Sequence, residues 1–175
     1  MKGKRPFFPE GGYNIAMHRV MELGEFIRRR RLSLRLTQKD VSASLGYTPQ
    51  ALSKIEKGYS TLGLNLLIPL CNELQISVTD LASRNLSAEY KTVPYPPINE
   101  DAFFHNLRSA RLHAGVSQKD EAVIVGVSKR TIITYEKRKA TPSTEFLRRF
   151  SEYYGLDAER VLFDQLFDSE NRPIK

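Results

Sequence analysis

The sequence predicts an all-α protein that consists of two copies of one helical unit. Apolar residues recur at helical spacing, Ser, Thr and Asp stand where helices begin, and the chain matches itself after a shift of 80 residues. The shift lays RLSLRLTQKDVSASLGYTPQALSKIEKGYST over RLHAGVSQKDEAVIVGVSKRTIITYEKRKAT without a gap. Residues 23–81 and 103–161 share 11 identical positions, and most others keep their apolar or polar character. The chain is therefore expected to fold as a tandem repeat.

A proline-rich linker is expected between the two copies. Pro94, Pro96 and Pro97 within AEYKTVPYPPINED exclude a regular helix and favour an extended, polyproline-like path. About ten such residues would span roughly 30 Å. Asn99 or Asp101 would cap the helix that follows. The predicted parts are an N-terminal extension 1–22, a first domain 23–84, a linker 85–100, a second domain 101–163 and a C-terminal tail 164–175.

The first two helices of each copy have separate signals. At 100° per residue, the apolar residues of 23–34 fall on one face with Arg31 at its edge, where a charge needs a partner. The second helix begins at a capping-box pattern, Thr37 with Asp40 and Ser117 with Asp120.

A turn of about four residues joins the second helix to the third. Gly46 and Gly126 end the second helix, because glycine adopts the left-handed conformation at low cost. Thr48 and Ser128 then cap the third helix, and Pro49 suits its first position. A fourth helix and a short fifth, beginning at Ser77, follow in the first copy. The predicted inner face of the fourth helix comprises Leu64, Leu67, Leu70, Cys71 and Leu74.

Composition narrows the function classes. A net charge of +7 and a pI near 9.6 favour a polyanionic partner. One cysteine excludes an intrachain disulfide, and no Cys or His cluster has zinc-ligand spacing, so we expect no metal and no cofactor. The chain shows no signal peptide, no bilayer-length apolar run and none of the common nucleotide-binding or hydrolase motifs. These features predict a cytoplasmic protein that is not an enzyme.

TQKDVSASLGYTPQALSKIEKG and SQKDEAVIVGVSKRTIITYEKRKATP resemble the Cro and phage-repressor (Xre-like) helix-turn-helix family. Its pattern runs T-Q-x-x-L-A-x-x-x-G-v-s-x-x-x-I-s-x-x-E-x-G-x-x-x-P, and the resemblance covers residues 23–82 and 103–162. It implies two tandem five-helix, lambda-repressor-like domains. In each, the third helix would enter the major groove of double-stranded DNA.

The resemblance also implies which residues touch DNA. Gln38 and Gln118 would open the second helix against a phosphate. Base edges would face Pro49, Gln50, Ala51, Ser53 and Lys54 in the first copy, and Lys129, Arg130, Thr131, Ile133 and Thr134 in the second. Gln suits adenine, Lys and Arg suit guanine, and Thr or Ile methyls suit the thymine methyl. The phosphate backbone would meet the cations just past the third helix: Lys57, Lys137, Arg138 and Lys139.

The run RRRR at 28–31 divides into different roles. The resemblance implies that Arg31 pairs with Glu56 and Arg111 with Glu136, as internal ion pairs that are costly to break. Arg31 is then structural.

The other arginines of the run lie outside this pair. Arg28, matched by Arg108, lies on the rim and is a phosphate candidate, whereas Arg29 faces solvent. Arg30 occupies the apolar stripe where the second copy has Ala110, so it either reaches to the surface or meets the N-terminal extension.

Some positions depart from the family pattern. Glu121 stands where a leucine is usual, and Val123 and Ile124 occupy positions that should be exposed. Either that helix is rotated, or it presents apolar surface to a partner. Arg138 replaces the glycine after the third helix, and Leu62 replaces a usual proline, which leaves the local turn geometry open.

Two functions fit these features. The first is a sequence-specific DNA-binding transcriptional regulator, a repressor, whose two copies read two unlike half-sites roughly 34 Å apart. The second has DNA bound by the first domain alone, with the second domain serving dimerisation, an effector or a partner, as in an antitoxin or adaptor. A homodimer stays open in both, and the sequence names no small-molecule effector.

The two ends leave further alternatives. The N-terminal extension is either a basic arm for the minor groove or a partly ordered tail. In the C-terminal segment, Val161, Leu162, Leu166 and Phe167 recur at helical spacing. This segment is expected to dock on its own domain or on a second subunit.

Overall fold

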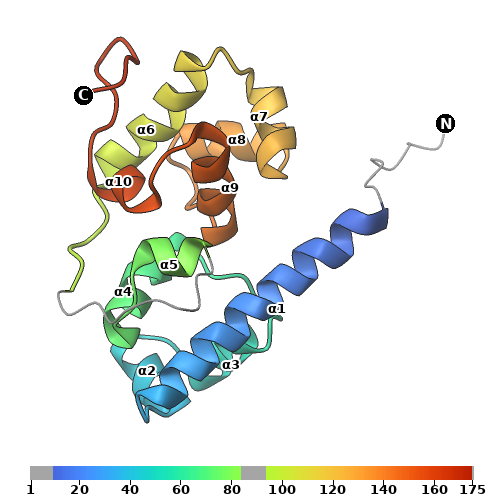
Figure 1. The fold of residues 1–175 in the computed structure, drawn as a ribbon, viewed down its shortest axis with the longest axis vertical. Coiled ribbons are helices and arrows are strands. Elements are labelled where there is room, and N and C mark those ends of the chain that lie inside the picture. Colours follow the sequence, from blue (N-terminus) through green and yellow to red (C-terminus); the bar gives the residue numbers. More distant parts are fainter. Residues whose placement is uncertain (1–9, 84–93, 175) are drawn as a thin grey trace. The chain divides into compact units, whose positions relative to one another are not determined.

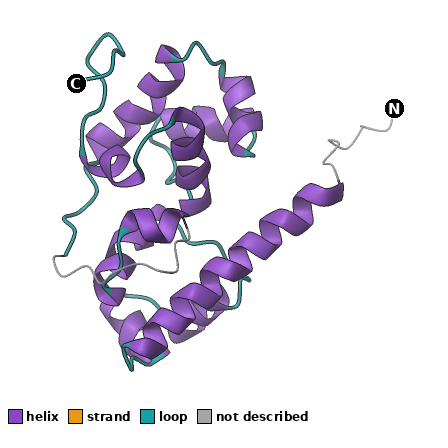
Figure 2. Cartoon of the chain, viewed as in Figure 1, coloured by secondary structure: helices purple, strands orange, loops and turns teal. Residues whose placement is uncertain are grey.

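The computed structural model describes the backbone of residues 10–83 and 94–174, and the side chains from Glu22 onward within these ranges. The described residues form ten α-helices and no strand longer than an isolated bridge (Figures 1 and 2). The all-α prediction is confirmed. The chain divides into two compact units, residues 1–61 and 62–175.

Unit 1 holds three helices, α1 (Glu10–Ser33), α2 (Gln38–Ser44) and α3 (Pro49–Glu56). Helix α1 begins well before the predicted first helix, and it packs against α3. The two helices lie close together at Gly24, where an added Cβ would lie 2.3 Å from the Ile55 carbonyl oxygen. The capping box is present at Thr37, and Thr48 accepts a hydrogen bond from the Ala51 amide, as predicted.

Unit 2 holds seven helices: α4 (Leu64–Leu74), α5 (Val78–Ser83), α6 (Glu100–His113), α7 (Gln118–Val125), α8 (Lys129–Glu136), α9 (Thr144–Tyr154) and α10 (Ala158–Phe163). Helices α4 and α5 come from the first copy, and α6 to α10 form the second. The predicted inner face of α4 is buried throughout, and Leu147 and Phe150 of α9 and Leu162 of α10 are buried as well. Asn99, Ser117 and Ser128 cap α6, α7 and α8 as expected.

Equivalent residues of the two copies meet within unit 2. Gly63 and Ser143, which are related by the 80-residue repeat, form an antiparallel bridge. The Leu64 amide donates to the Pro142 carbonyl at 3.1 Å, and the Thr144 amide donates to the Leu62 carbonyl at 2.9 Å. The pairing is therefore reciprocal, as in an isologous dimer contact formed inside one chain.

The end of the linker is packed and not merely extended. Residues 85–93 of the predicted linker lie outside the described residues, and residues 94–99 form no helix. Tyr95 is buried, its ring stacks on Phe163 at 5.5 Å between centroids, and its backbone exchanges hydrogen bonds with Asn72. Its hydroxyl accepts from the Val78 amide and donates to Glu159. Tyr95 thus connects α4 and α5 with α10.

The C-terminal tail packs on the second copy, as one of the two expectations had it. Helix α10 ends at Phe163, so the continued helical spacing predicted for Leu166 and Phe167 is wrong. The chain turns back instead, Phe167 bridges with Pro173, and the Phe167 carbonyl lies 2.9 Å from His105 Nε2.

Candidate nucleic-acid interface

Two helix-turn-helix segments are formed by α2 with α3 and by α7 with α8. In each, a glycine with positive φ, Gly46 at 65° or Gly126 at 70°, directs the chain into the next N-cap. The third-helix side chains Leu52 and Ile132 are buried below the turn. The opposite faces of α3 and α8 are consequently left toward solvent.

An internal ion pair anchors the end of α3. Arg31 Nε and Nη2 donate to the two carboxylate oxygens of Glu56 at 2.6 and 3.0 Å, and Nη1 donates to the Leu36 carbonyl. Both side chains are buried, and the hydrogen bonding of Arg31 to the Glu56 carboxylate raises the pKa of Arg31. The predicted pairing of Arg31 with Glu56 is present in the structure, so this arginine has a structural role inside the fold.

The second copy holds a different version of the pair. Arg111 makes one hydrogen bond to Glu136, from Nε at 2.6 Å, and Nη1 donates to the Val116 carbonyl. A second carboxylate, Glu121 of α7, lies 3.7 Å from Arg111 Nε and accepts from the Tyr154 hydroxyl at 3.0 Å. Burial raises the pKa of Glu121 to about 7, against the lowering effects of Tyr154 and Arg111.

The two glutamines at the helix-two N-termini join these networks. Gln38 Nε2 donates to Glu56 at 2.8 Å, and Gln118 Nε2 donates to Glu136 at 2.7 Å. The sequence reasoning assigned both glutamines to phosphate and missed this link. In the sequence, the only sign of this link is that 18 residues separate the glutamine from the glutamate in both copies. Each glutamine is half-buried, and its side-chain amide oxygen takes no part in these hydrogen bonds to glutamate.

The predicted reading faces differ in exposure along their length. Gln50 and Lys54 of α3, and Lys129 and Arg130 of α8, are exposed. The remaining predicted base-facing residues are half-buried: Pro49, Ala51, Ser53, Thr131, Ile133 and Thr134. The Thr134 hydroxyl donates to the Arg130 carbonyl, which leaves its methyl group for other contacts.

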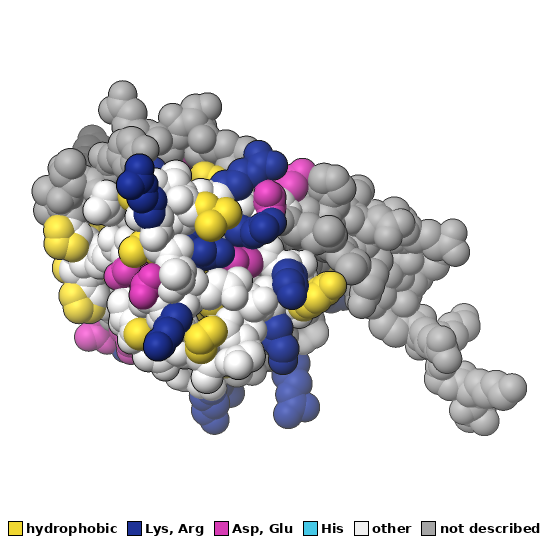
Figure 3. Space-filling model, turned by 90° about the horizontal axis from the view of Figure 1, so that it is seen from below, with side chains coloured by type: hydrophobic (Ala, Val, Ile, Leu, Met, Phe, Trp, Pro, Cys, Tyr) yellow, Lys and Arg dark blue, Asp and Glu magenta, His cyan; other side chains and the backbone are white. Residues whose placement is uncertain are grey.

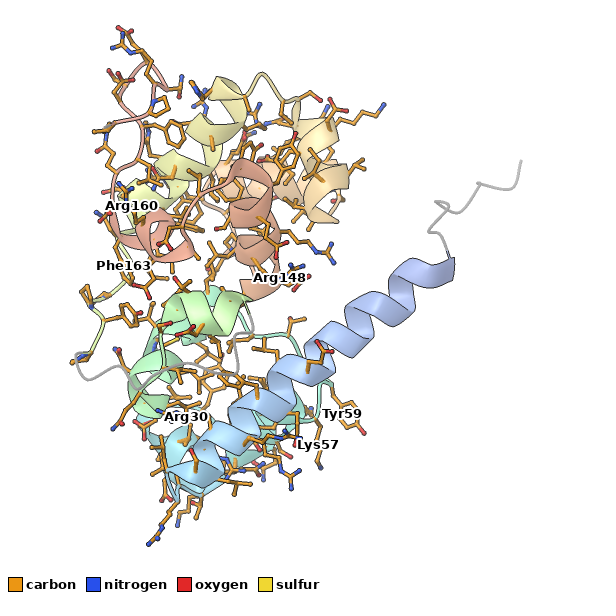
Figure 4. The ribbon with its side chains drawn as sticks, in the orientation of Figure 1. Arg30, Lys57, Tyr59, Arg148, Arg160 and Phe163 are labelled. Carbon is orange, nitrogen blue, oxygen red and sulfur yellow. The ribbon has the colours of Figure 1, made fainter. Side chains whose placement is uncertain are left out.

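The turns after α3 and α8 carry the flanking cations. Lys57, Lys137 and Lys139 are exposed, whereas Arg138 pairs with Asp101 and lies over the Phe104 ring. Tyr59, two residues after Lys57, is 75% exposed, a candidate contact that the sequence reasoning missed (both residues are labelled in Figure 4). It occupies the position of Lys139 in the second copy, and that equivalence was the available signal.

The rim arginines are solvent-accessible. Arg28 lies 3.6 Å from Glu25, its side chain is 56% exposed, and Arg108 is exposed as well. Arg29 donates to Glu25 at 2.9 Å on the outer face, and Arg30 is half-buried (Figure 4). Figure 3 shows one face on which Lys and Arg side chains stand out, with fewer Asp and Glu among them. Such a face suits a polyanion.

Comparison with known families agrees with this arrangement. One helix-turn-helix family model matches residues 27–81, and a helix-turn-helix domain model matches residues 103–163. The chain belongs to the Xre-like helix-turn-helix family, in two tandem copies. Neither the curated proteins nor the solved structures gave a match.

This tandem helix-turn-helix protein keeps the turn geometry at its irregular positions. Arg138 adopts φ of 55°, close to the 73° of its counterpart Gly58. Leu62 and Pro142 are both buried, and both carbonyls accept the reciprocal hydrogen bonds described above. Local strain at Arg138 is tolerated because the turn is held by the Lys139 amide, which donates to the Thr134 carbonyl.

Helix α7 of the tandem helix-turn-helix protein is not rotated. Gln118 makes the same contact to a glutamate as Gln38, Glu121 is 2% exposed, and Val123 is 78% exposed. Ile124 is half-buried. Of the two alternatives, rotation is wrong, and α7 presents Val123 to solvent.

Within the described ranges of the tandem helix-turn-helix protein, no group of three His, Cys, Asp or Glu is placed to hold a metal ion. None of its described helices has the length and apolarity that crossing a membrane requires.

Proposed function

We propose that the protein is a sequence-specific transcriptional repressor that reads the major groove with α3 and α8. The main support is that both helices expose a polar or cationic side chain at the same repeat position, Gln50 in α3 and Arg130 in α8. Lys54 is exposed as well, and its counterpart Thr134 is half-buried with a methyl group suited to thymine. The protein carries out no catalysis in this proposal and acts by occupying its operator.

Paired substitutions in each reading helix test the proposal. Gln50→Ala with Lys54→Ala, and separately Lys129→Ala with Arg130→Ala, should change the base preference obtained from a random DNA pool. Lys119→Ala, on the exposed side of α7, is a matched control that should leave base preference unchanged. If the second pair leaves affinity and footprint unaltered, the two-reader proposal fails.

One chain supplies both readers in this proposal. Support comes from the reciprocal pairing of residues 62–64 with 142–144, which joins equivalent segments of the two copies without a second subunit. Because the two reading helices differ in sequence, the operator should contain two unlike half-sites, roughly one helical turn apart. Sedimentation without DNA should then find a monomer.

A second candidate function rests on Val123. Its exposure on α7 would suit a partner or a second copy, with DNA bound by the first domain alone. In that case a random pool should yield a single half-site, and Val123→Ser should weaken assembly without changing the selected sequence.

A further inference from the structure

The second copy contains a buried polar pair that the first copy lacks. Glu121 and Tyr154 occupy the positions that Val41 and Leu74 occupy in the first copy, and both of those residues are 0% exposed. The exchange replaces two apolar side chains with a carboxyl group and the hydroxyl that donates to it at 3.0 Å. A buried carboxyl group is costly when ionised, so this pair changes the properties of the core.

The pair lies against the ion pair that anchors α8. Arg111 of α6 stands between two carboxylates, bonded to Glu136 at 2.6 Å and 3.7 Å from Glu121. The side chains of Arg111 and Glu121 are 9% and 3% exposed, so water screens them poorly. The Arg111 guanidinium therefore lies close to two carboxylates. The Arg31 guanidinium pairs with the carboxylate of Glu56 alone, through two hydrogen bonds.

Every element packed around Glu121 contributes to its electrostatic surroundings. Arg111 faces it from α6, Glu136 from α8, and Tyr154 from α9, while Arg149 of α9 donates to the Val125 carbonyl at the other end of α7. With Glu121 protonated, Arg111 and Glu136 balance each other. With Glu121 ionised, the cluster carries one excess negative charge, and that charge attracts Arg111 away from Glu136.

The cluster is connected to a predicted phosphate contact. Glu136 accepts the Gln118 side-chain amide at 2.7 Å and closes the reading helix α8. We propose that ionisation of Glu121 lowers the DNA affinity of the second copy, so that this copy releases DNA as the pH rises. This regulation rests on the proposed DNA-binding function. Loss of the Glu136 anchor and the added negative charge near phosphate act in the same direction.

Comparison of the full chain with its Glu121→Gln variant tests the regulation. The affinity for a duplex selected from a random pool is measured at about pH 6 and about pH 8, at constant ionic strength. The wild-type affinity should fall roughly fivefold more than that of Glu121→Gln, a coupling at the low end of allosteric effects. The neutral amide keeps the shape of the side chain, and the comparison between the two proteins cancels effects of pH that do not arise from Glu121.

A second variant keeps the test decisive if Glu121→Gln fails to fold. Glu121→Val with Tyr154→Leu copies the residues of the first copy and should show the same reduced pH dependence as Glu121→Gln. Equal pH dependence in wild type and both variants would overturn the proposal.

An NMR titration without DNA separates this proposal from the proposed function. The Gln118 side-chain amide and Arg111 Nε–H resonances should move together with a midpoint near neutrality in the wild type, and stay still in Glu121→Gln. Absence of that transition in the wild type overturns the switch itself. If the transition occurs but no duplex binds at any pH, the DNA-binding function fails, and control of affinity fails with it.

Discussion

At the scale of single residues, the two arginines Arg28 and Arg31 are chemically identical but differ in burial. Arg31 is enclosed with Glu56, and its removal would leave that carboxylate without its cation in the core. Arg31→Met should therefore lower the free energy of unfolding by about 3 kcal/mol. Arg28→Met, at an exposed pair, should change it by less than about 0.5 kcal/mol.

Urea unfolding followed by circular dichroism measures both changes. Arg31→Met with Glu56→Leu should recover most of the lost stability, because no buried charge then lacks a partner. Equal effects of the two single variants would contradict the structural role of Arg31.

The raised pKa of Glu121 predicts how the free energy of unfolding depends on pH. Its pKa rises from 4.5 in the unfolded chain to about 7 in the fold, mainly because of burial. Below the unfolded pKa the carboxyl is protonated in both states. Between the two values the folded state retains a proton that the unfolded state has lost, so stability falls as pH rises, by at most about 1.4 kcal/mol per pH unit. Above about pH 7 the loss is complete.

Chemical denaturation of the full chain at several pH values tests this slope. Glu121→Gln should remove most of the decrease between about pH 5 and about pH 7, because the amide does not titrate there. The same slope in wild type and variant would contradict the assignment to Glu121.

At the scale of elements, the crossing of α1 and α3 depends on a missing side chain. A Cβ at Gly24 would lie 2.3 Å from the Ile55 carbonyl oxygen and 2.6 Å from that of Glu56, and backbone does not move aside easily. Gly24→Ala should lower the free energy of unfolding by about 2 to 3 kcal/mol, as overpacked contacts do.

Gly46→Ala is the matched comparison within the same unit. Its φ is 65°, but an added Cβ would meet nothing within 4 Å. Gly46→Ala should lower the free energy of unfolding by about 1 kcal/mol, because alanine is disfavoured in the left-handed backbone conformation. Thermal unfolding ranks the two, and a larger loss for Gly46→Ala would mean that helix contact does not limit position 24.

Local signals predicted the elements better than the contacts between them. Capping patterns and helical spacing identify α2, α3 and α4 because those signals lie within a few residues of each helix. The pairing of residues 62–64 with 142–144 and the bonds of Tyr95 join residues far apart in sequence, and no local pattern encodes them. At the site, the family resemblance implied the pairing of Arg31 with Glu56. The second carboxylate near Arg111, that of Glu121, became evident only in the folded structure.

At the scale of the whole molecule, the tandem repeat brings dimer-like pairing into one chain. Equivalent segments meet at Gly63 and Ser143, but the surrounding residues have diverged. Gln50 against Arg130, and Val41 against Glu121, give each copy its own surface and core. A homodimer must present identical readers, whereas a covalent repeat is free to differentiate them.

Tyr95 is where coupling between the copies can be tested. It links Asn72 and Val78 of the first copy to Glu159 and Phe163 of the second. Tyr95→Ala removes the ring and hydroxyl contacts and leaves the backbone bonds to Asn72. We expect the wild type to lose at least about tenfold in affinity when about five base pairs, half a helical turn, separate the selected half-sites further. Tyr95→Ala should lose less.

Anisotropy titrations with the original and the lengthened duplex measure this difference. Tyr153→Ala, at an exposed tyrosine of α9, serves as the control and should keep the wild-type sensitivity to spacing. Tyr95→Ala should bind an isolated half-site as the wild type does, because neither reading helix contains it. If the wild type tolerates the insertion as well as Tyr95→Ala, the two copies act as independent modules, and the contacts of Tyr95 serve stability alone.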